Sequence, residues 1–550
     1  MDPSLRQLTR RLDVHWAAVA CIVAGFVVLA SWQVRLPGLY YDELFQETTA
    51  LAFVKGGLAS QAAVLPGTQI SLLGHPLPVM ANSYIGAVKT ISFSPVAAVF
   101  GITPASVRFF TISVAALSLL AYAAFARIIF RSGIVAVVAT ALLALDPSFV
   151  FFSRVDFGPS VFMFLLKGLA LWQLAVWWRT RRLSSLVVGS LALGLGVYDK
   201  ANFLWIVVAV PLAAVLVRAR EVRARLDRRQ LAFAGGAFLV GCLPLVVYNL
   251  AWPPRTLLPV LHGSLHIAGG NQAGGPITQL HQRFEQLVDL LDGTTIVGLL
   301  GELGARPPLL PILCGVAAVA ILAASLDRRL RPRLVAARFV VLAGLLVLLA
   351  SALTPGGSYA HHVLLTYPFP HLALAAFAVE LRPLARVRVG AAVAGALGAL
   401  AGAAVVAAAG VSLATDTQLL SRLSKTGGNG NFSDAIYDLN HYLSAQGASS
   451  GFVALDWGIY QNLIGLSQGR LRGDELWLEL SGRSPDLARY RSELTSPKTR
   501  YVLHAVDKTN FPRARERFFE VVRESGRRTR LEKVLDSRDG DPLFEVYRVS

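Results

Sequence analysis

Long apolar segments separated by short basic loops dominate this sequence and restrict its fold more than any other feature. Many of these segments reach the roughly 20 residues that a helix needs to cross a bilayer. Of the 550 residues, 54% are hydrophobic and 16% are charged, and the mean hydropathy is +0.54. A typical soluble domain has a charged fraction of about 25%. We therefore expect a polytopic all-α membrane protein.

Eleven apolar segments are predicted to span the membrane as helices. They lie at approximately 16–34, 105–126, 132–152, 160–178, 183–198, 201–217, 231–251, 308–326, 334–353, 361–381 and 389–413. The first segment is longer than the apolar core of a signal peptide and lacks a following small-residue cleavage site. We therefore expect it to remain in the protein as a helix.

Basic residues alternate between the two sides of this predicted topology. Of the 52 lysines and arginines, only eight are lysines. Twenty-two arginines fall on the side of the N-terminus, whereas the longer loops of the other side hold eight basic residues. Because cytoplasmic loops are enriched in Lys and Arg, the N-terminus is predicted to be cytoplasmic. This pattern explains the net charge of +18 without a nucleic-acid partner.

Three segments are then predicted on the outer side of the plasma (inner) membrane. They are loops at about 35–104 and 252–307, and everything after about 414. The apolar stretch 84–100 is interrupted by a lysine and a proline, which favours an interfacial helix over a span. Leucine and phenylalanine recur at helical spacing over 279–292, which predicts a second, amphipathic surface helix.

The composition changes near residue 425, which divides the chain into two predicted domains. A glycine-rich linker occupies 425–430. Beyond it we predict helices at 432–446 and 512–525 and strands at 451–457, 499–506 and 543–549. The expected organisation is a transmembrane domain, 1–424, followed by a small extracytoplasmic α/β domain, 425–550.

The three cysteines, Cys21, Cys242 and Cys314, all lie within apolar segments and form no CxxC pair. This spacing suggests neither a disulfide framework nor a zinc site. The sequence also contains no P-loop and no dinucleotide-binding glycine pattern.

An acidic pair, Asp42 and Glu43, follows the first predicted span. Placing carboxylates where a helix leaves the membrane costs free energy, so their presence calls for an explanation. A solvated loop is one explanation, and a polar reaction site at the membrane surface is the other. The remaining motifs have to decide between them.

Further motifs occur in a fixed order on the predicted outer side. They are Gly-Gly at 56–57, His-Pro-Leu-Pro at 75–78, GITPASVR at 101–108, Asp-Pro at 146–147, Arg-Val-Asp at 154–156, and Lys200. With the acidic pair and this topology, they resemble the GT-C class of membrane glycosyltransferases over residues 35–250. The closest resemblance is to the dolichyl-phosphate-mannose protein mannosyltransferase and aminoarabinose transferase superfamily. The family usually reads His-Pro-Pro-Leu where this chain has His-Pro-Leu-Pro.

The resemblance implies a reaction and its partners. A polyprenyl-phosphate sugar donor enters from the membrane lipids, and its sugar passes to a lipid, glycan or protein acceptor on the outer face with inversion. The resemblance leaves metal use open, since some members of the class use a divalent metal at the acidic pair whereas the protein mannosyltransferases need none. No cofactor is certain from the sequence, and a divalent metal stays possible.

Three acidic residues are the candidates for catalysis. The resemblance implies that Asp42 is the base, whereas the alternative is a loop acid that caps a following helix. Glu43 is a candidate to assist, to bind a cation or to cap the same helix. Asp156 is predicted on the same membrane face and would orient the acceptor, unless it only pairs with Arg154.

Five basic residues are candidates to bind the donor phosphate: Lys200, Arg255, Arg108, His361 and His362. A lone lysine suits phosphate as a point charge, although it is also typical of a side chain that snorkels to the interface. Arg108 alternatively holds the first outer loop. Adjacent histidines on a helix point about 100° apart, which disfavours a metal site built from this pair alone.

Two more residues complete the candidate set. His75, before a proline, and Tyr359, beside the histidine pair, are predicted near the acceptor or the first outer loop. A histidine in this position is more typical of a turn than of a ligand.

Three other functions stay open at this level. A lipid-linked phosphoryl transferase would want more histidine at the outer face. A transporter or flippase of a lipid-linked saccharide predicts charges within helices and internal repeats, yet only Lys167 lies mid-helix and no repeat is visible. A non-catalytic membrane scaffold leaves Asp42, Asp156 and Lys200 on one face unexplained.

Overall fold

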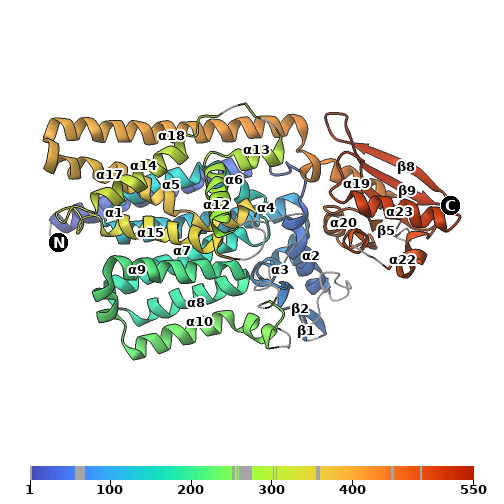
Figure 1. The fold of residues 1–550 in the computed structure, drawn as a ribbon, viewed down its shortest axis with the longest axis horizontal. Helices are drawn as coiled ribbons and strands as arrows, with labels where there is room; N and C mark the ends of the chain where they lie inside the picture. Colours follow the sequence, from blue (N-terminus) through green and yellow to red (C-terminus); the bar gives the residue numbers. More distant parts are fainter. Residues whose placement is uncertain are drawn as a thin grey trace.

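A computed structural model describes residues 3–55, 68–72, 74–250, 254–256, 258, 275–301, 303–304, 306–354, 359–447, 451–482 and 486–550. Figure 1 shows a long bundle of helices with the N-terminus at one end and a small β-sheet region, holding the C-terminus, at the other. Helices α2 and α3 and two short hairpins lie beside the end of the bundle that is nearer to the sheet.

Seven helices in the described ranges are long and apolar enough to cross a membrane. They are α1 (Pro3–Ser31), α4 (Pro104–Phe130), α7 (Ser160–Thr180), α9 (Leu204–Arg225), α10 (Arg228–Asn249), α15 (Val335–Ala352) and α18 (Ala391–Thr426). Two bent pairs bring the number to nine if each pair is one span. These pairs are α5 (Gly133–Ala144) with α6 (Pro147–Arg154), and α16 (Ala360–Val363) with α17 (Phe369–Val389).

The prediction of a multi-pass helical membrane protein is confirmed, but the number of eleven spans is not. The segments predicted at 183–198 and 308–326 form α8 (Leu183–Asp199) and α14 (Leu309–Ala324). These helices have 17 and 16 residues, so they are shorter than a typical span. Composition alone therefore does not establish that they cross.

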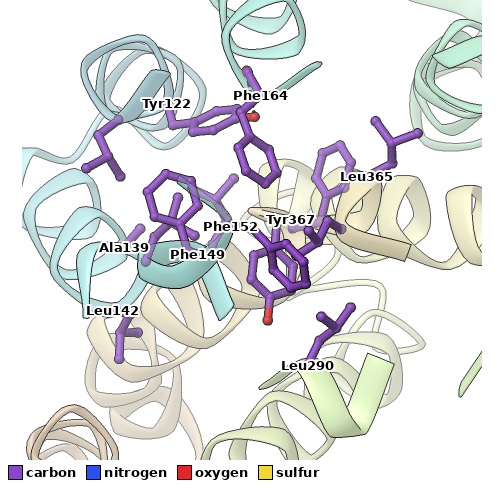
Figure 2. Packing of buried hydrophobic residues seen from close by; sticks show 14 of the residues in the cluster. Tyr122, Ala139, Leu142, Phe149, Phe152, Phe164, Leu290, Leu365 and Tyr367 are labelled. Carbon is purple, nitrogen blue, oxygen red and sulfur yellow. Dashed lines mark hydrogen bonds between the residues drawn. The ribbon is translucent and has the colours of Figure 1, made fainter. Parts of the chain in front are cut away.

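The bend between α5 and α6 has a local cause in the sequence. Asp146 caps α6 by accepting a hydrogen bond from the backbone N–H of Phe149 (2.9 Å), and Pro147 occupies the first turn. The two helix axes differ by 64°. Figure 2 shows Phe149 and Phe152 of α6 packed among Tyr122 of α4, Ala139 of α5 and Tyr367 of the turn before α17, so the bent segment lies within the core.

The segments predicted to lie on the outer side form short helices and hairpins rather than spans. They comprise α2 (Tyr41–Lys55), the hairpins β1–β2 (Gln69–Leu72 and His75–Pro78) and β3–β4 (Met80–Asn82 and Ile85–Gly86), α3 (Val88–Phe100), α12 (Pro276–Leu291) and α13 (Thr294–Leu300). The stretches predicted as surface helices at 84–100 and 279–292 correspond to α3 and α12. Helix α2 buries polar as well as apolar side chains, so its polar groups require partners within the protein.

The C-terminal region contains a five-stranded mixed sheet with the order β6-β5-β7-β9-β8. Its elements are α19 (Ala435–Ala445), β5 (Phe452–Ala454), α20 (Tyr460–Leu466), β6 (Gly473–Glu475), α21 (Trp477–Ser481), α22 (Leu487–Leu494), β7 (Arg500–His504), α23 (Pro512–Glu524), β8 (Thr529–Asp536) and β9 (Pro542–Val549). Strands β6, β5 and β7 are parallel, whereas β9 runs antiparallel to both neighbours. Separate apolar clusters cover the two faces of this sheet.

Candidate active site

Glu43 and Arg108 form a fully buried ion pair that closes the first outer loop onto α4. The Arg108 Nε lies 2.7 Å from Glu43 Oε1, and Nη2 lies 3.1 Å from Oε2. The other guanidinium N–H groups donate to the carbonyls of Val34, Pro37 and Gly38. All five donors of Arg108 are thus used within the protein. This geometry supports loop holding, the alternative role of Arg108, over phosphate binding.

The second Glu43 oxygen also receives the backbone N–H of Tyr40 at 3.0 Å, just before α2 begins. Of the roles considered for Glu43, the structure therefore shows helix capping. The Glu43 carboxylate accepts hydrogen bonds from Arg108 and from the Tyr40 N–H. Asp42 is therefore the member of the acidic pair that is the better candidate for catalysis.

Asp42 lies in the first turn of α2, and its side chain is half-buried. In the part of the chain that the structure describes, its carboxylate has no hydrogen bond and no salt bridge. Burial raises the pKa of Asp42 to about 6, while the positive charges of Lys200 and Lys89 act in the opposite direction. A carboxylate that is unpaired and titrates near neutral pH is suited to accept a proton.

Lys200 lies between α8 and the next helix and is 2% exposed. Its backbone forms a β-bridge with Ile85, and the next N–H, of Ala201, donates to the Tyr84 carbonyl at 3.0 Å. These contacts fix Lys200 against the segment that precedes α3. Burial lowers the pKa of Lys200 to about 8, although Asp42 and other carboxylates oppose this shift.

Gly86 is required for this close approach of the two segments. A Cβ atom at Gly86 would lie 2.3 Å from the backbone oxygen of Tyr198, well inside contact distance. The Gly86 carbonyl also accepts a hydrogen bond from Gln46 Nε2 at 3.1 Å. Helix α2 and the Lys200 segment are thus joined through one short strand.

Asp156 lies fully buried in the turn between α6 and α7. One oxygen accepts the backbone N–H of Val161 at 3.2 Å, and the other lies 3.0 Å from Lys89 Nζ. The alternative of an Arg154–Asp156 surface pair is not present. Arg154 instead donates to the carbonyls of Gln33 and Leu36.

Sequence reasoning missed two residues of this site, Lys89 and Glu47. Lys89 Nζ lies 2.9 Å from Glu47 Oε1 as well as 3.0 Å from Asp156 Oδ2, and all three side chains are fully buried. The available signal was a lone lysine in an apolar stretch and an acidic residue four positions after Glu43. Nothing local in the sequence pairs them.

Aromatic rings and the histidine pair surround Asp42 and Lys200. Tyr40 stacks on Phe432 with ring centroids 4.3 Å apart and contacts Phe157 at 4.6 Å. The Phe157 ring meets His361 edge-on at 5.6 Å. His361 and His362 are both within electrostatic range of Lys200. The structure therefore gathers the histidine pair with Lys200.

Tyr359 belongs to the same group of residues. Its ring stacks on His361 at 5.8 Å, and its hydroxyl is within electrostatic range of Tyr40 and Tyr84. Tyr40 and Tyr84 both also sense the charge of Asp42. Tyr359 therefore lies near the base candidate.

Two candidates are less clearly tied to this group. The Arg255 guanidinium lies 5.4 Å from the centre of the Tyr248 ring, in the turn after α10. His75 lies at the start of β2, and its side chain is outside the described residues. Among the described residues, no three His, Cys, Asp or Glu side chains are arranged to hold a metal ion.

The C-terminal region contacts α2 directly beside Asp42. Tyr41 donates to Glu475 at the end of β6 (2.8 Å), and Thr48 donates to Gln461 of α20 (2.6 Å). Asn462 donates to the carbonyl of Leu39 at 2.7 Å. The helix that carries Asp42 is thus held from both the bundle and the sheet region.

Comparisons with known proteins agree with this architecture. Residues 93–252 match the family model of dolichyl-phosphate-mannose-protein mannosyltransferase. A comparison with curated proteins found no significant match. Among solved structures, ArnT from Cupriavidus metallidurans bound to undecaprenyl phosphate is similar, with a TM-score of 0.61 and 12% identity, over 96% of this chain and 97% of that chain.

An archaeal oligosaccharyltransferase, AglB from Archaeoglobus fulgidus in complex with an inhibitory peptide and a dolichol-phosphate, is also similar. Its TM-score is 0.51 and its identity is 13%, over 89% of this chain and 69% of that chain. At these identities the structural similarity establishes the fold. The resemblance to the GT-C class is confirmed at the level of the fold, and the family model that matches residues 93–252 agrees with it.

Proposed function

We propose that this membrane protein of the GT-C fold transfers a sugar from a polyprenyl-phosphate donor to an acceptor on the outer face, with inversion. The observation that carries the proposal is the Asp42 carboxylate, unpaired among the described residues and close enough to sense the buried Lys200. The undecaprenyl phosphate of ArnT and the dolichol-phosphate of AglB support a donor of this chemical class. The acceptor is a lipid, a glycan or a protein.

Asp42 acts as the general base in this reaction. It accepts the proton of the acceptor hydroxyl while that oxygen attacks the anomeric carbon of the donor sugar. The bond between the anomeric carbon and the phosphate oxygen breaks, and polyprenyl phosphate leaves with the electron pair. A single displacement of this kind inverts the anomeric configuration.

Lys200 stabilises the negative charge that develops on the departing phosphate. Its ammonium is buried, where a charge interacts more strongly than in water. His361 and His362 lie within electrostatic range of Lys200 and contribute further hydrogen-bond donors or acceptors. Arg255, which lies over the Tyr248 ring after α10, is the remaining candidate for the phosphate.

The pKa values of Asp42 and Lys200 predict one pH window for both roles. Asp42 must be deprotonated to accept a proton, which requires a pH above its pKa of about 6. Lys200 must be protonated to stabilise phosphate, which requires a pH below its pKa of about 8. Activity is therefore expected to be highest near pH 7.

The membrane arrangement that fits this function has α8 and α14 completing eleven crossings in the plasma membrane. The N-terminus is then cytoplasmic, as the loop arginines predict. Residues 425–550 form a separate extracytoplasmic α/β domain, and Asp42, Asp156 and Lys200 face the same compartment. A cysteine-accessibility assay on both sides of the membrane tests this arrangement.

Transfer of labelled sugar from a panel of polyprenyl-phosphate sugars in nanodiscs tests the function. Asp42→Asn should abolish most turnover while leaving the protein folded, and Asp156→Asn should also reduce it. Asp539→Asn, in the exposed β8–β9 turn, is the matched control for a lost carboxylate. Normal turnover by Asp42→Asn would refute the assignment of the base. The assay is run with and without chelator, and a loss of turnover with chelator would indicate a divalent metal.

The transporter alternative receives no support from the buried lysine of α7. Lys167 Nζ donates to the Leu365 carbonyl at 2.9 Å and lies over the ring of Phe164. This hydrogen bond therefore connects α7 to the segment after α16. This contact explains the one mid-helix lysine without a translocation pathway.

A further inference from the structure

Glu47, Lys89 and Asp156 form a buried charge cluster next to the proposed base. Lys89 Nζ lies 2.9 Å from Glu47 Oε1 and 3.0 Å from Asp156 Oδ2, and it also donates to the Gly158 carbonyl at 3.2 Å. All three side chains are fully buried. Opposite charges this close attract strongly in a buried site, because the interior screens them much less than water does.

The charge cluster joins three elements that build the proposed active site. Glu47 comes from α2, which carries Asp42, and Lys89 comes from α3. Asp156 and Gly158 come from the α6–α7 turn, and Gly158 lies close to the ammonium of Lys200. One lysine therefore fixes the distance between the helix of the base and the turn beside the phosphate-binding lysine.

The charges that act directly on Asp42 come from α3, from the α6–α7 turn and from the segment after α8. Lys200 and Lys89 are positive, whereas Asp156 is negative. Glu47 faces Lys89 and Asp156, and Asp199 at the end of α8 faces Lys200, Lys89 and Asp156. Four carboxylates thus accompany two lysines in this buried region.

Tyrosines rather than further charges complete the surroundings of Asp42. Tyr40 and Tyr41 precede it, and Tyr84 lies within electrostatic range. Carboxylates outnumber lysines in this region, and nearby negative charges raise the pKa of Asp42. The positive charge of each lysine therefore favours the ionised form of Asp42.

We propose that Lys89 is a positioning residue whose charge offsets Glu47 and Asp156, so that Asp42 stays ionised and correctly placed beside Lys200. This inference rests on the proposed role of Asp42 as the base. It assigns to Lys89 no contact with the substrate, because its ammonium is fully occupied by Glu47, Asp156 and Gly158.

Burial and pKa shifts agree with this role. The two carboxylates raise the pKa of Lys89, so it remains protonated despite its burial. Burial is the largest influence on Glu47 and Asp156 and raises the pKa of both, while Lys89 counteracts it. Removal of Lys89 would leave two carboxylates buried together without a counter-charge, which is strongly unfavourable.

A charge series at this cluster tests the inference through the pH dependence of kcat. The variants are Lys89→Arg, Lys89→Met, Glu47→Gln and the double variant Lys89→Met with Glu47→Gln, and Asp539→Asn is the control. At full ionisation the cluster has a net charge of −1 in the wild type and in the double variant. That charge is −2 in Lys89→Met and 0 in Glu47→Gln.

The expected result is that the acidic limb of the pH–kcat profile follows the cluster charge. It should move up in Lys89→Met, down in Glu47→Gln and back toward the wild type in the double variant, by on the order of one pH unit. Lys89→Arg should keep the limb in place. If Lys89→Met fails to fold, Glu47→Gln and the double variant carry the test.

Two outcomes would overturn the inference. One is an acidic limb that stays fixed across the folded variants while only the maximal rate falls, since this indicates a purely structural lysine. The other is a double variant that shifts as far as Lys89→Met. Failure of the proposed function itself is recognised separately, because Asp42→Asn would then retain turnover with the same acidic limb.

Discussion

Glu43→Gln should destabilise the protein, whereas Asp42→Asn, which removes the adjacent carboxylate, should not. The Glu43 carboxylate accepts three hydrogen bonds, at 2.7 and 3.1 Å from Arg108 and at 3.0 Å from the Tyr40 N–H. Glutamine removes the negative charge and turns one acceptor into a donor that faces the guanidinium. Breaking a buried pair in this way costs about 3–5 kcal/mol.

A double-mutant cycle with Arg108→Met isolates the interaction between the two side chains. Arg108→Met should be at least as destabilising as Glu43→Gln, because it also leaves the carbonyls of Val34, Pro37 and Gly38 without donors. The double variant should lose less than the sum of the two single changes, with a coupling of about 2–3 kcal/mol.

Reversible unfolding in mixed SDS–detergent micelles, followed by tryptophan fluorescence, measures these free energies. Asp539→Asn serves as the surface control and should unfold like the wild type. The reasoning is refuted if Glu43→Gln stays within about 0.5 kcal/mol of the wild type, or if the two single changes are additive. Either result would mean that the pair contributes nothing beyond what solvent would supply.

Four further predictions concern catalysis and packing. Asp42→Asn should lower kcat by about 10²–10⁴-fold with an unchanged melting temperature, and normal kcat would contradict its role as the base. The pH–kcat profile of the wild type should be bell-shaped with limbs near 6 and 8, measured in the same transfer assay, since Asp42 must lose and Lys200 must keep a proton. Lys200→Met should remove the upper limb and lower kcat, and a retained limb would assign it to another group. Gly86→Ala should destabilise the protein by about 1–3 kcal/mol, because its Cβ would collide with the backbone oxygen of Tyr198, and an unchanged midpoint in the unfolding assay would refute this.

The membrane class and the GT-C fold were accessible from the sequence because their signals are local or ordered along the chain. Apolar length identifies spans without knowledge of contacts. The outer motifs follow one another in a family-specific order, which makes the resemblance informative. The helices at the two predicted spans 183–198 and 308–326 are shorter than a bilayer usually requires, so their length does not identify them as spans.

The charge pairings of the site could not be predicted because they are not local. Glu43 pairs with Arg108, 65 positions later, and Glu47 and Asp156 meet at Lys89 from two other elements. Composition identifies such residues as polar groups in apolar surroundings but does not choose their partners. For this reason Arg108 was a candidate for phosphate, and Lys89 was counted only as a loop charge.

The contacts that hold α2 in place depend on residues that are synthesised late. The helix that carries Asp42 leaves the ribosome early, yet Glu475, Gln461 and Asn462, which brace it through Tyr41, Thr48 and Leu39, emerge more than 400 residues later. Residues 461–475 must therefore be synthesised before Tyr41, Thr48 and Leu39 have these partners, so a chain that ends before residue 461 lacks all three contacts.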